Sequence, residues 1–314
     1  MSIPPFEVLQ PESLQEACEL LGKHSSEGAA VLAGGTDILV DIRRPIIPEH
    51  LPRCSGCDPK TLMPRKAVEK PPAYMVALSR IPDLSGISEA KNGDISIGSM
   101  TTITQICESQ LVREKLTALA EGGDNLGSPL VRNRGTLGGN ICNARPAADA
   151  LVPSVALGAQ LELQSVNETR IVSVSDFVTG PGRTIRKADE VLSKVIFPAL
   201  PEMSGSSCIK LANRKALEIS VVNVAAVLTL DKAGKISQAK VALGSVAPTP
   251  VLAEKAAASL IGEKPSDDLF KEAGKTAAGE CKPITDHRGS ALYRVDMVGI
   301  LVKNALQKAL ERAR

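Results

Sequence analysis

The stretch of the chain best suited to hold a charged ligand runs from residue 128 to residue 149. It contains Gly135, Gly138 and Gly139, which lack a Cβ and can adopt positive φ, so that nearby backbone amides can point at an anion. Hydroxyl and amide side chains stand around these glycines. The stretch ends at Asp149, a candidate N-cap for a helix in the apolar run that follows. This composition indicates a loop that wraps a phosphate or pyrophosphate.

A second glycine-rich turn lies upstream. An apolar run at 29–33 stops at Gly34-Gly35 and resumes at 38–42, which predicts two extended segments joined by a turn that exposes backbone amides. Neither loop has the glycine spacing of a Rossmann fingerprint or the Gly-Lys-Ser/Thr of a P-loop. A Gly-Gly pair is also common in a plain turn between strands. Two such loops in one chain nevertheless favour one long, bent ligand.

The two loops together carry a family resemblance. Their sequences are Ala33-Gly34-Gly35-Thr36-Asp37 and Arg132-Asn133-Arg134-Gly135-Thr136-Leu137-Gly138-Gly139-Asn140. This pair resembles the flavin-binding signature of the molybdenum hydroxylases, and the whole chain is similar to the separate FAD-binding medium subunit of the xanthine dehydrogenase and carbon monoxide dehydrogenase family. The segments 210–214 and 286–294 resemble the carboxy-terminal domain of that family.

The resemblance and the predicted elements together imply an α+β fold in two domains. Residues 1–200 would form a two-lobed FAD-binding domain, with a small α/β unit at 1–50 and an antiparallel-rich α+β unit at 75–200. Residues 205–314 would form a carboxy-terminal α+β domain of three strands followed by helices.

Particular segments are expected to build these units. A capping box at Ser13 to Glu16 predicts an amphipathic helix, and Thr102 begins a further helix. A helix is also expected at 112–121, and the last helix has an apolar stripe that indicates core packing, with a partner-binding face as the alternative. Strands are expected at 75–78, 95–98, 161–164, 171–174, 191–197, 208–212, 220–230 and 236–244.

The resemblance also implies which residues bind FAD. The amides of both glycine loops, with the Thr36 hydroxyl, would hold the pyrophosphate, and two apolar residues before the first loop would pack near the adenosine end. An acidic residue, a leucine that packs on the ring system and a lysine beside the flavin complete the set, although an ordinary surface charge is the alternative for this lysine. The implied residues are Val31, Leu32, Ala33, Gly34, Gly35, Thr36, Asp37, Thr136, Leu137, Gly138, Gly139, Asn140, Asp149, Leu192 and Lys210.

No residues form a recognisable catalytic constellation. The sequence has no HExxH motif, and its three histidines, His24, His50 and His287, stand in unrelated contexts. We therefore expect the chain to hold a cofactor that does the chemistry. By resemblance, a large molybdopterin subunit oxidises the substrate, and a small subunit with two [2Fe-2S] clusters passes electrons to this FAD and onward, often to NAD+. A heterotrimer or its dimer is implied; a free-standing flavin reductase is the alternative.

The segment 43–72 is rich in proline, lysine and arginine and has no periodicity, which predicts a surface loop; relative to the family it resembles an insertion. Within it, Cys54 and Cys57 have the spacing of half a zinc or iron-sulfur site, which would need further ligands. A bare or redox-sensitive thiol pair is the other interpretation. A metal-binding interaction module built on this pair is a third function class.

Composition limits the partners. The 37 basic and 35 acidic residues leave a net charge of +2, and there is no tryptophan, so neither charge nor aromatic content favours nucleic-acid binding. No apolar run is long enough to span a bilayer, and the amino terminus does not resemble a signal peptide. Seven scattered cysteines are typical of free thiols in a reducing compartment. We expect a cytoplasmic protein.

Overall fold

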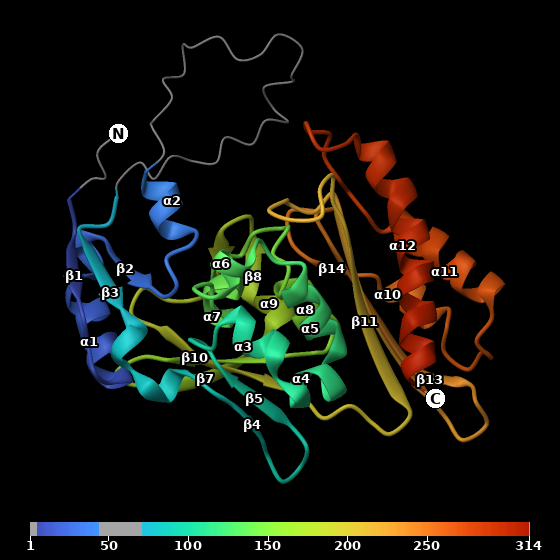
Figure 1. The fold of residues 1–314 in the computed structure, drawn as a ribbon, viewed down its shortest axis with the longest axis horizontal. Coiled ribbons are helices and arrows are strands. Elements are labelled where there is room, and N and C mark those ends of the chain that lie inside the picture. The colour runs from blue at the N-terminus through green and yellow to red at the C-terminus, as the bar shows by residue number, and fades with distance from the viewer. Residues whose placement is uncertain (1–4, 44–70, 314) are drawn as a thin grey trace.

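The computed structural model describes residues 5–43 and 71–313 of the 314-residue chain. Figure 1 shows an α+β molecule whose amino-terminal unit, middle unit and carboxy-terminal unit lie in a row. Most of the predicted insertion at 43–72, with Cys54 and Cys57, lies outside the described residues. The predicted α+β class is confirmed.

The amino-terminal unit is a three-stranded parallel sheet in the order β1-β3-β2, packed against helix α1. Ser13 caps α1 by accepting a hydrogen bond from the Glu16 amide at 3.1 Å, whereas the Glu16 carboxylate accepts one from the amide of Glu12 rather than of Ser13. The elements are β1 (Glu7–Leu9), α1 (Leu14–Lys23), η1 (Ser25–Glu27), β2 (Ala29–Leu32), α2 (Ile38–Ile42) and β3 (Tyr74–Ala77).

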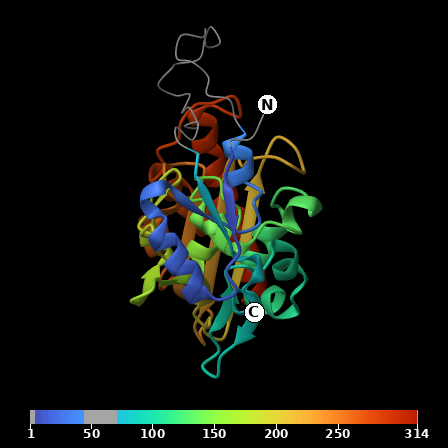
Figure 2. The same ribbon diagram turned by 90° about the vertical axis from the view of Figure 1, so that its left-hand side faces the viewer.

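The prediction of an extended segment at 38–42 is wrong, because these residues form the one-and-a-half-turn helix α2. A segment of five residues, four of them apolar, is too short for its periodicity to distinguish a strand from a helix. The parallel sheet takes its third strand from residues 74–77 instead. The strand β2 therefore leads through the first glycine loop into a helix, and Figure 2 shows this blue amino-terminal unit in front of the other units.

The middle unit is a five-stranded antiparallel sheet in the order β4-β5-β10-β6-β7, as the predicted antiparallel-rich unit requires. Its strands are β4 (Ile87–Glu89), β5 (Ile95–Gly98), β6 (Gln160–Gln164), β7 (Thr169–Ser173) and β10 (Val191–Phe197), with a separate hairpin of β8 (Val178–Gly180) and β9 (Arg183–Thr184). The central strand β10 is almost wholly buried. It is hydrogen-bonded to β5 along one edge and to β6 along the other, so it joins the two halves of the sheet.

Short helices cover one face of this sheet. Thr102 and Gln105 form the capping box of α3, and the helix expected at 112–121 is broken at Leu116, which has non-helical dihedral angles. The helices are η2 (Leu78–Arg80), η3 (Pro82–Leu84), α3 (Ile103–Glu108), α4 (Gln110–Lys115), α5 (Thr117–Asp124), α6 (Pro129–Arg132), α7 (Leu137–Cys142), α8 (Leu151–Ala156) and α9 (Val174–Phe177). The glycine-rich stretch at 128–149 is not a plain loop, because it contains α6 and α7.

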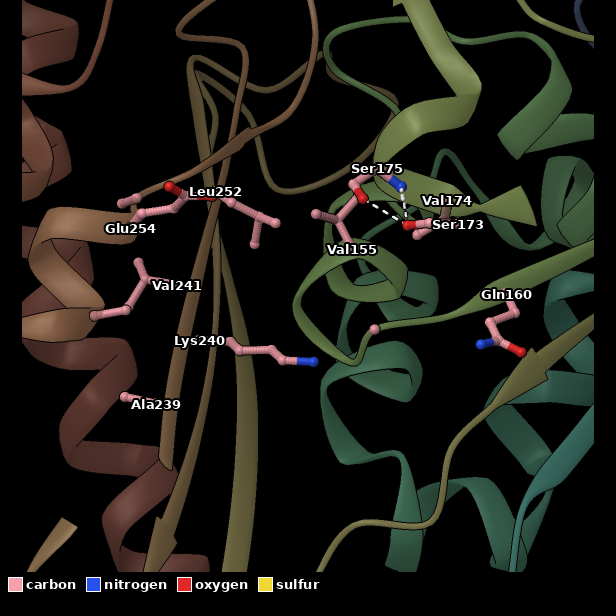
Figure 3. A pocket seen from close by; sticks show the side chains of 13 residues that line it. Val155, Gln160, Ser173, Val174, Ser175, Ala239, Lys240, Val241, Leu252 and Glu254 are labelled. Atoms are coloured by element: carbon pink, nitrogen blue, oxygen red, sulfur yellow. Dashed lines mark hydrogen bonds between the residues drawn. The ribbon is translucent and has the colours of Figure 1, made fainter. Parts of the chain in front are cut away.

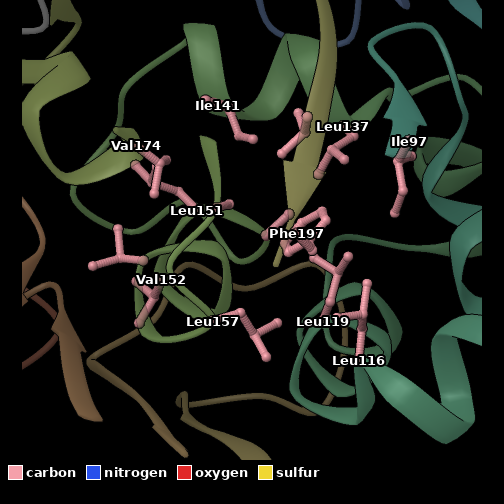
Figure 4. Close-up of a cluster of buried hydrophobic side chains, with 14 of the residues drawn as sticks. Ile97, Leu116, Leu119, Leu137, Ile141, Leu151, Val152, Leu157, Val174 and Phe197 are labelled. Atoms are coloured by element: carbon pink, nitrogen blue, oxygen red, sulfur yellow. The ribbon is translucent and has the colours of Figure 1, made fainter. Parts of the chain in front are cut away.

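The largest hydrophobic cluster lies between these helices and the sheet. Figure 4 shows Leu137 and Ile141 of α7 meeting Phe197 of β10 and Leu151 of α8. All four side chains are fully buried. The apolar side of α7 is thus anchored in the core. This packing fixes the position of the opposite side of the helix.

The carboxy-terminal unit is a four-stranded antiparallel sheet in the order β11-β12-β13-β14, with helices packed on it. Its elements are β11 (Ser204–Leu211), β12 (Val222–Leu230), β13 (Ile236–Gly244), β14 (Val251–Leu252), α10 (Glu254–Ala258), α11 (Asp267–Gly279) and α12 (Ala291–Arg312). The three predicted strands are present, but β14 is a fourth that was not expected. The predicted stripe of α12 is buried from Val298 to Ala309, which confirms core packing. Among the described residues, no helix is both long and apolar enough to cross a bilayer.

Candidate functional site

A cavity of about 580 Å³ lies where the three units meet. Both glycine loops, the start of β10 and a segment of the carboxy-terminal unit line it. Its volume falls in the range of ordinary ligand and cofactor sites. The structure brings together there every residue of the predicted FAD set except Leu32, Leu137 and Lys210, which lie just behind the lining.

The first glycine loop presents a row of free backbone amides to this cavity. The residues from Gly34 to Ile38 all line it, and none of their N–H groups has an acceptor in the described part of the chain. The row leads into the first turn of α2, where N–H groups carry partial positive charge. Successive unpaired amides of this kind bind phosphate groups.

The second glycine loop differs, because most of its amides are already used. Leu137 donates to the Thr101 carbonyl at 3.0 Å, Gly138 to the Ser99 carbonyl at 2.9 Å, and Gly139 to the Thr136 hydroxyl at 3.1 Å. The expectation that the amides of both loops are free for an anion therefore holds only for the first. The second loop supplies part of the cavity wall, to which Gly138, Gly139 and Asn140 of α7 contribute.

The glycines of the second loop do not use the positive φ that glycine permits. A Cβ on Gly138 would lie 2.6 Å from the Ser99 Cβ, so glycine is needed there for close packing against the end of β5. A Cβ on Gly34 would collide with the Arg134 carbonyl, which shows that the two loops touch each other. Only Gly35, at φ 74°, combines a position in these loops with a left-handed conformation.

An ion pair holds the two loops together at the edge of the cavity. Arg145 Nη2 lies 2.5 Å from Asp41 Oδ2, and both side chains are mostly buried. Arg145 follows α7, and Asp41 lies in α2. The pair therefore fixes α2, and with it the free amides, against the second loop.

Asp149 is not the N-cap of α8, because Ala150 occupies that position and no side-chain bond caps the helix. Its carboxylate instead accepts hydrogen bonds from two groups of the carboxy-terminal unit, Lys210 Nζ at 2.8 Å and Ser220 Oγ at 3.2 Å. Burial raises the pKa of Asp149 to about 6, although Lys210 and Ser220 lower it in part. Lys210 is only 6% exposed, so the alternative of a solvated surface charge does not hold.

The apolar wall of the cavity comes from several elements. Leu192, at the start of β10, is 4% exposed and lines it as predicted. Residues that the sequence reasoning missed add to this wall: Leu78, Met100, Ile103, Leu126, Cys142, Leu217 and Ile219. Of these residues, those in the segment 212–220 could have been predicted from the sequence, because the segment directly continues the motif that begins at Lys210.

We call residues 212–220 the strap, because this segment of the carboxy-terminal unit extends over the cavity. The Leu217 amide donates to the Gly127 carbonyl at 3.0 Å, and Leu217 has a left-handed φ of 54°, which is unusual for a bulky residue. An ion pair between Arg214 and Glu218 at 2.7 Å closes the turn. The strap thus joins the carboxy-terminal unit to the loop before α6.

The described cysteines are poorly suited to chemistry. Burial raises the pKa of the Cys142 and Cys18 thiols to about 11 and that of Cys107 to about 12, so they stay protonated near neutral pH. No group of three or more His, Cys, Asp or Glu side chains within 5–43 and 71–313 could hold a metal ion. Cys54 and Cys57 lie outside these ranges, and the metal prediction for them stays open.

A second cavity, of about 410 Å³, is lined by residues of α8, α9, β13, β14 and α10. Figure 3 shows Lys240 reaching across it and Val155 of α8 facing Leu252 of β14. Ser173 and Ser175 hydrogen-bond to each other there at 2.6 Å. It shares no lining residue with the first cavity, and its walls are mostly small apolar side chains.

Comparison with known proteins gives matches along nearly the whole chain. Residues 55–200 match the model of the FAD binding domain in molybdopterin dehydrogenase, and residues 207–309 match that of the CO dehydrogenase flavoprotein C-terminal domain. The chain is 33% identical to the carbon monoxide dehydrogenase medium chain of Hydrogenophaga pseudoflava over 99% of both chains. It is 30% identical to the xanthine dehydrogenase FAD-binding subunit of Escherichia coli O157:H7, covering 96% of this chain and 94% of that protein.

Solved structures give the same picture. The chain superimposes on carbon monoxide dehydrogenase from Hydrogenophaga pseudoflava with a TM-score of 0.87 and 32% identity, covering 99% of each chain. It also matches quinoline 2-oxidoreductase from Pseudomonas putida 86, with a TM-score of 0.85 and 26% identity over 100% of this chain and 99% of that one. The likeness therefore extends over all three units.

Proposed function

Because the chain belongs to the FAD-binding medium subunits of the molybdenum hydroxylase family, we propose that its cavity of about 580 Å³ holds the FAD and that this FAD relays electrons from a [2Fe-2S] partner subunit to NAD+ or another acceptor. Bound FAD accepts electrons singly or in pairs and passes them on. Molybdopterin and iron-sulfur clusters belong to other subunits in this family. The protein is thus an oxidoreductase subunit whose substrate-oxidising site lies on another chain.

The row of free amides from Gly34 to Ile38 is the observation that carries the proposal. A pyrophosphate needs several donors that are not already paired, and this loop offers them in sequence at the start of α2. In the proposed site the Thr36 hydroxyl adds a further donor. The second loop, from Thr136 to Asn140, forms the opposite wall.

The remaining residues of the set have separate parts in the proposed site. Val31 packs near the adenosine end with Leu32 behind it, and Leu192 provides an apolar contact for the ring system. Asp149 and Lys210 supply a buried ion pair at the wall formed by the carboxy-terminal unit. Leu137 acts from behind the lining by anchoring α7 in the core.

The proposed electron path crosses subunit boundaries. Because iron-sulfur clusters belong to other subunits in this family, electrons would reach the FAD from a partner chain and leave to NAD+ or another acceptor. We expect a heterotrimer with a large molybdopterin subunit and a small [2Fe-2S] subunit, or its dimer. The family supports this composition, and the substrate is chosen by the large subunit.

The first experiment is a visible absorption spectrum of the purified chain, with release of the chromophore and an iron and zinc assay on the same sample. One FAD per chain without metal supports the proposal and favours plain thiols at Cys54 and Cys57. Iron or zinc beside the FAD would make that pair a metal site. A colourless protein that cannot be reconstituted with FAD would contradict the proposal.

The relay itself is tested by mixing the FAD-loaded chain with a reduced [2Fe-2S] partner subunit and following flavin bleaching by stopped flow. Bleaching should need the partner, and NAD+ should restore the colour if it is the acceptor. Rapid turnover of NADH by the chain alone would instead identify a free-standing flavin reductase.

A further inference from the structure

The Asp149 carboxylate stands at the boundary between two units and is held entirely from one side. Its residue belongs to the segment that follows the second glycine loop, and it lines the cavity proposed for FAD. Both of its hydrogen-bond donors come from the carboxy-terminal unit: Lys210 on β11 and Ser220 just before β12. The Asp149 side chain is 10% exposed, and Ser220 is 1% exposed. Water therefore cannot substitute freely for either donor.

Three ionisable groups on the neighbouring elements are already neutral or paired, whereas Arg186, which also lines the cavity, donates to the backbone carbonyls of Lys187 and Glu190. The neighbouring Cys208 thiol stays protonated, because burial, Asp149 and Glu121 raise its pKa. Glu121 on α5 is bound to Arg312 at 2.6 Å. In the strap, Glu218 is bound to Arg214 at 2.7 Å. Lys210 is thus the cation that contacts the Asp149 carboxylate, and Ser220 is the neutral group that donates the second hydrogen bond to it.

Resting on the proposed function, we propose that Ser220 is a positioning residue which, by holding Asp149 in its charged form, lets the carboxy-terminal unit set the reduction potential of the bound FAD. Ser220 acts through Asp149 and does not line the cavity itself. Its hydroxyl donates to Oδ1 while Lys210 donates to Oδ2, so each oxygen has one partner. Removing the hydroxyl leaves a buried oxygen without a donor.

The electrostatic consequence has a definite sign. A hydrogen bond to a carboxylate favours its charged form, so loss of the Ser220 donor raises the pKa of Asp149 further above its present value of about 6. At a pH between the Asp149 pKa of the natural protein and that of the variant, the carboxyl group is neutral in the variant and negatively charged in the natural protein. Reduction adds electrons to the cavity, and a negative neighbour opposes this. The potential of the variant is therefore higher in this window, which lies around pH 6 to 7 by the usual strength of a charge-assisted bond.

The experiment measures the FAD midpoint potential from pH 5 to pH 9, by dye equilibration, in the full chain and three variants. Ser220→Ala removes the donor, and Ser220→Thr keeps it. Ser207→Ala is the matched control, because Ser207 is also fully buried in β11 but donates to the Ala305 carbonyl at 2.7 Å, away from Asp149.

A plot of the FAD midpoint potential against pH should change slope at the pKa of Asp149. In Ser220→Ala we expect this change of slope about one pH unit higher. It should stay in place in Ser220→Thr and Ser207→Ala. Superimposable curves for Ser220→Ala and the natural chain would overturn the inference. If Ser220→Ala does not fold, Ser220→Cys, a weak donor of similar size, should give a smaller shift in the same direction.

A measurement without FAD separates this inference from the proposed function. The pKa of Asp149 is read from carboxyl ¹³C shifts of the apo chain, assigned with Asp149→Asn, and should rise in Ser220→Ala. An unchanged value would overturn the inference while leaving the FAD assignment intact. A natural chain that binds no FAD would instead contradict the proposed function.

Discussion

The glycines around the cavity differ in their physical role, although the sequence motif presents them alike. Gly34 and Gly138 permit close contact between protein segments, with the Arg134 carbonyl and with Ser99 respectively. Gly35 has a left-handed backbone that turns the chain from β2 into α2. The amides that we assign to the pyrophosphate therefore depend most directly on Gly35.

Gly35→Ala should weaken FAD binding about ten-fold. Alanine in the left-handed region costs roughly 1–2 kcal/mol, and relief of that strain would rotate the free amides. Gly28→Ala is the matched control, since Gly28 has a φ of 89° but lies outside the cavity lining. Both variants should lose thermal stability. Equal FAD affinities for the two in a fluorescence titration would contradict the assignment.

At the level of single elements, burial decides what local sequence leaves open. The strand β12 is buried along all nine residues, because α8 packs against it as well as α12. Seven of its nine residues are apolar, and the two polar ones, Asn223 and Thr229, do not give an alternating pattern. The segment before α12 is held by a buried network in which Arg294 binds Asp286 at 2.7 Å and the Val221 carbonyl.

Asp286→Asn should lower the free energy of unfolding by about 3 kcal/mol at pH 7, because it leaves the Arg294 guanidinium buried without a counter-charge. Burial raises the pKa of Asp286, but the Arg288 amide and the Arg294 guanidinium outweigh it and hold that pKa below its usual range. This contribution is present above pH 4 and is lost as the pH falls through the lowered pKa. Urea unfolding at pH 7 and pH 3 measures both effects.

The exposed pair of Glu272 and Lys275 supplies the control. Glu272→Gln should change the unfolding free energy by less than about 0.5 kcal/mol at either pH. A loss of unfolding free energy in Asp286→Asn below about 0.5 kcal/mol would show that the buried network contributes little. The same conclusion would follow if the loss were no smaller at pH 3 than at pH 7.

At the scale of the whole molecule, the central hydrophobic cluster crosses the proposed domain boundary at 200–205. It combines the middle unit with Cys208, Ala225, Val227 and Ala242 of the carboxy-terminal sheet. The ion pairs Asp149–Lys210 and Glu121–Arg312 cross the same boundary. We therefore propose that residues 1–200 and 205–314 are two domains in architecture but one unit in stability.

The apo chain should accordingly unfold in a single transition. Differential scanning calorimetry should give a calorimetric enthalpy equal to the van't Hoff enthalpy. Two resolved transitions, or a calorimetric enthalpy near twice the van't Hoff value, would show that the domains are independent.

The sequence by itself determined the family, the α+β class, most strands and some of the residues that line the cavity. These features depend on local patterns, such as the paired glycine loops, the alternation in β5 and the apolar stripe of α12. It could not decide whether 38–42 is a strand or a helix, because a five-residue segment with four apolar side chains is compatible with either period. It also could not exclude a surface position for Lys210.

Only the tertiary structure decided how these residues work together. Whether an amide is free depends on which distant carbonyl lies beside it, and Ser99 and Thr101 occupy those of Gly138 and Leu137. The state of Asp149 likewise depends on burial and on donors from β11 and Ser220, more than sixty positions away in the chain. Such contacts join segments far apart in sequence, and no local pattern specifies them.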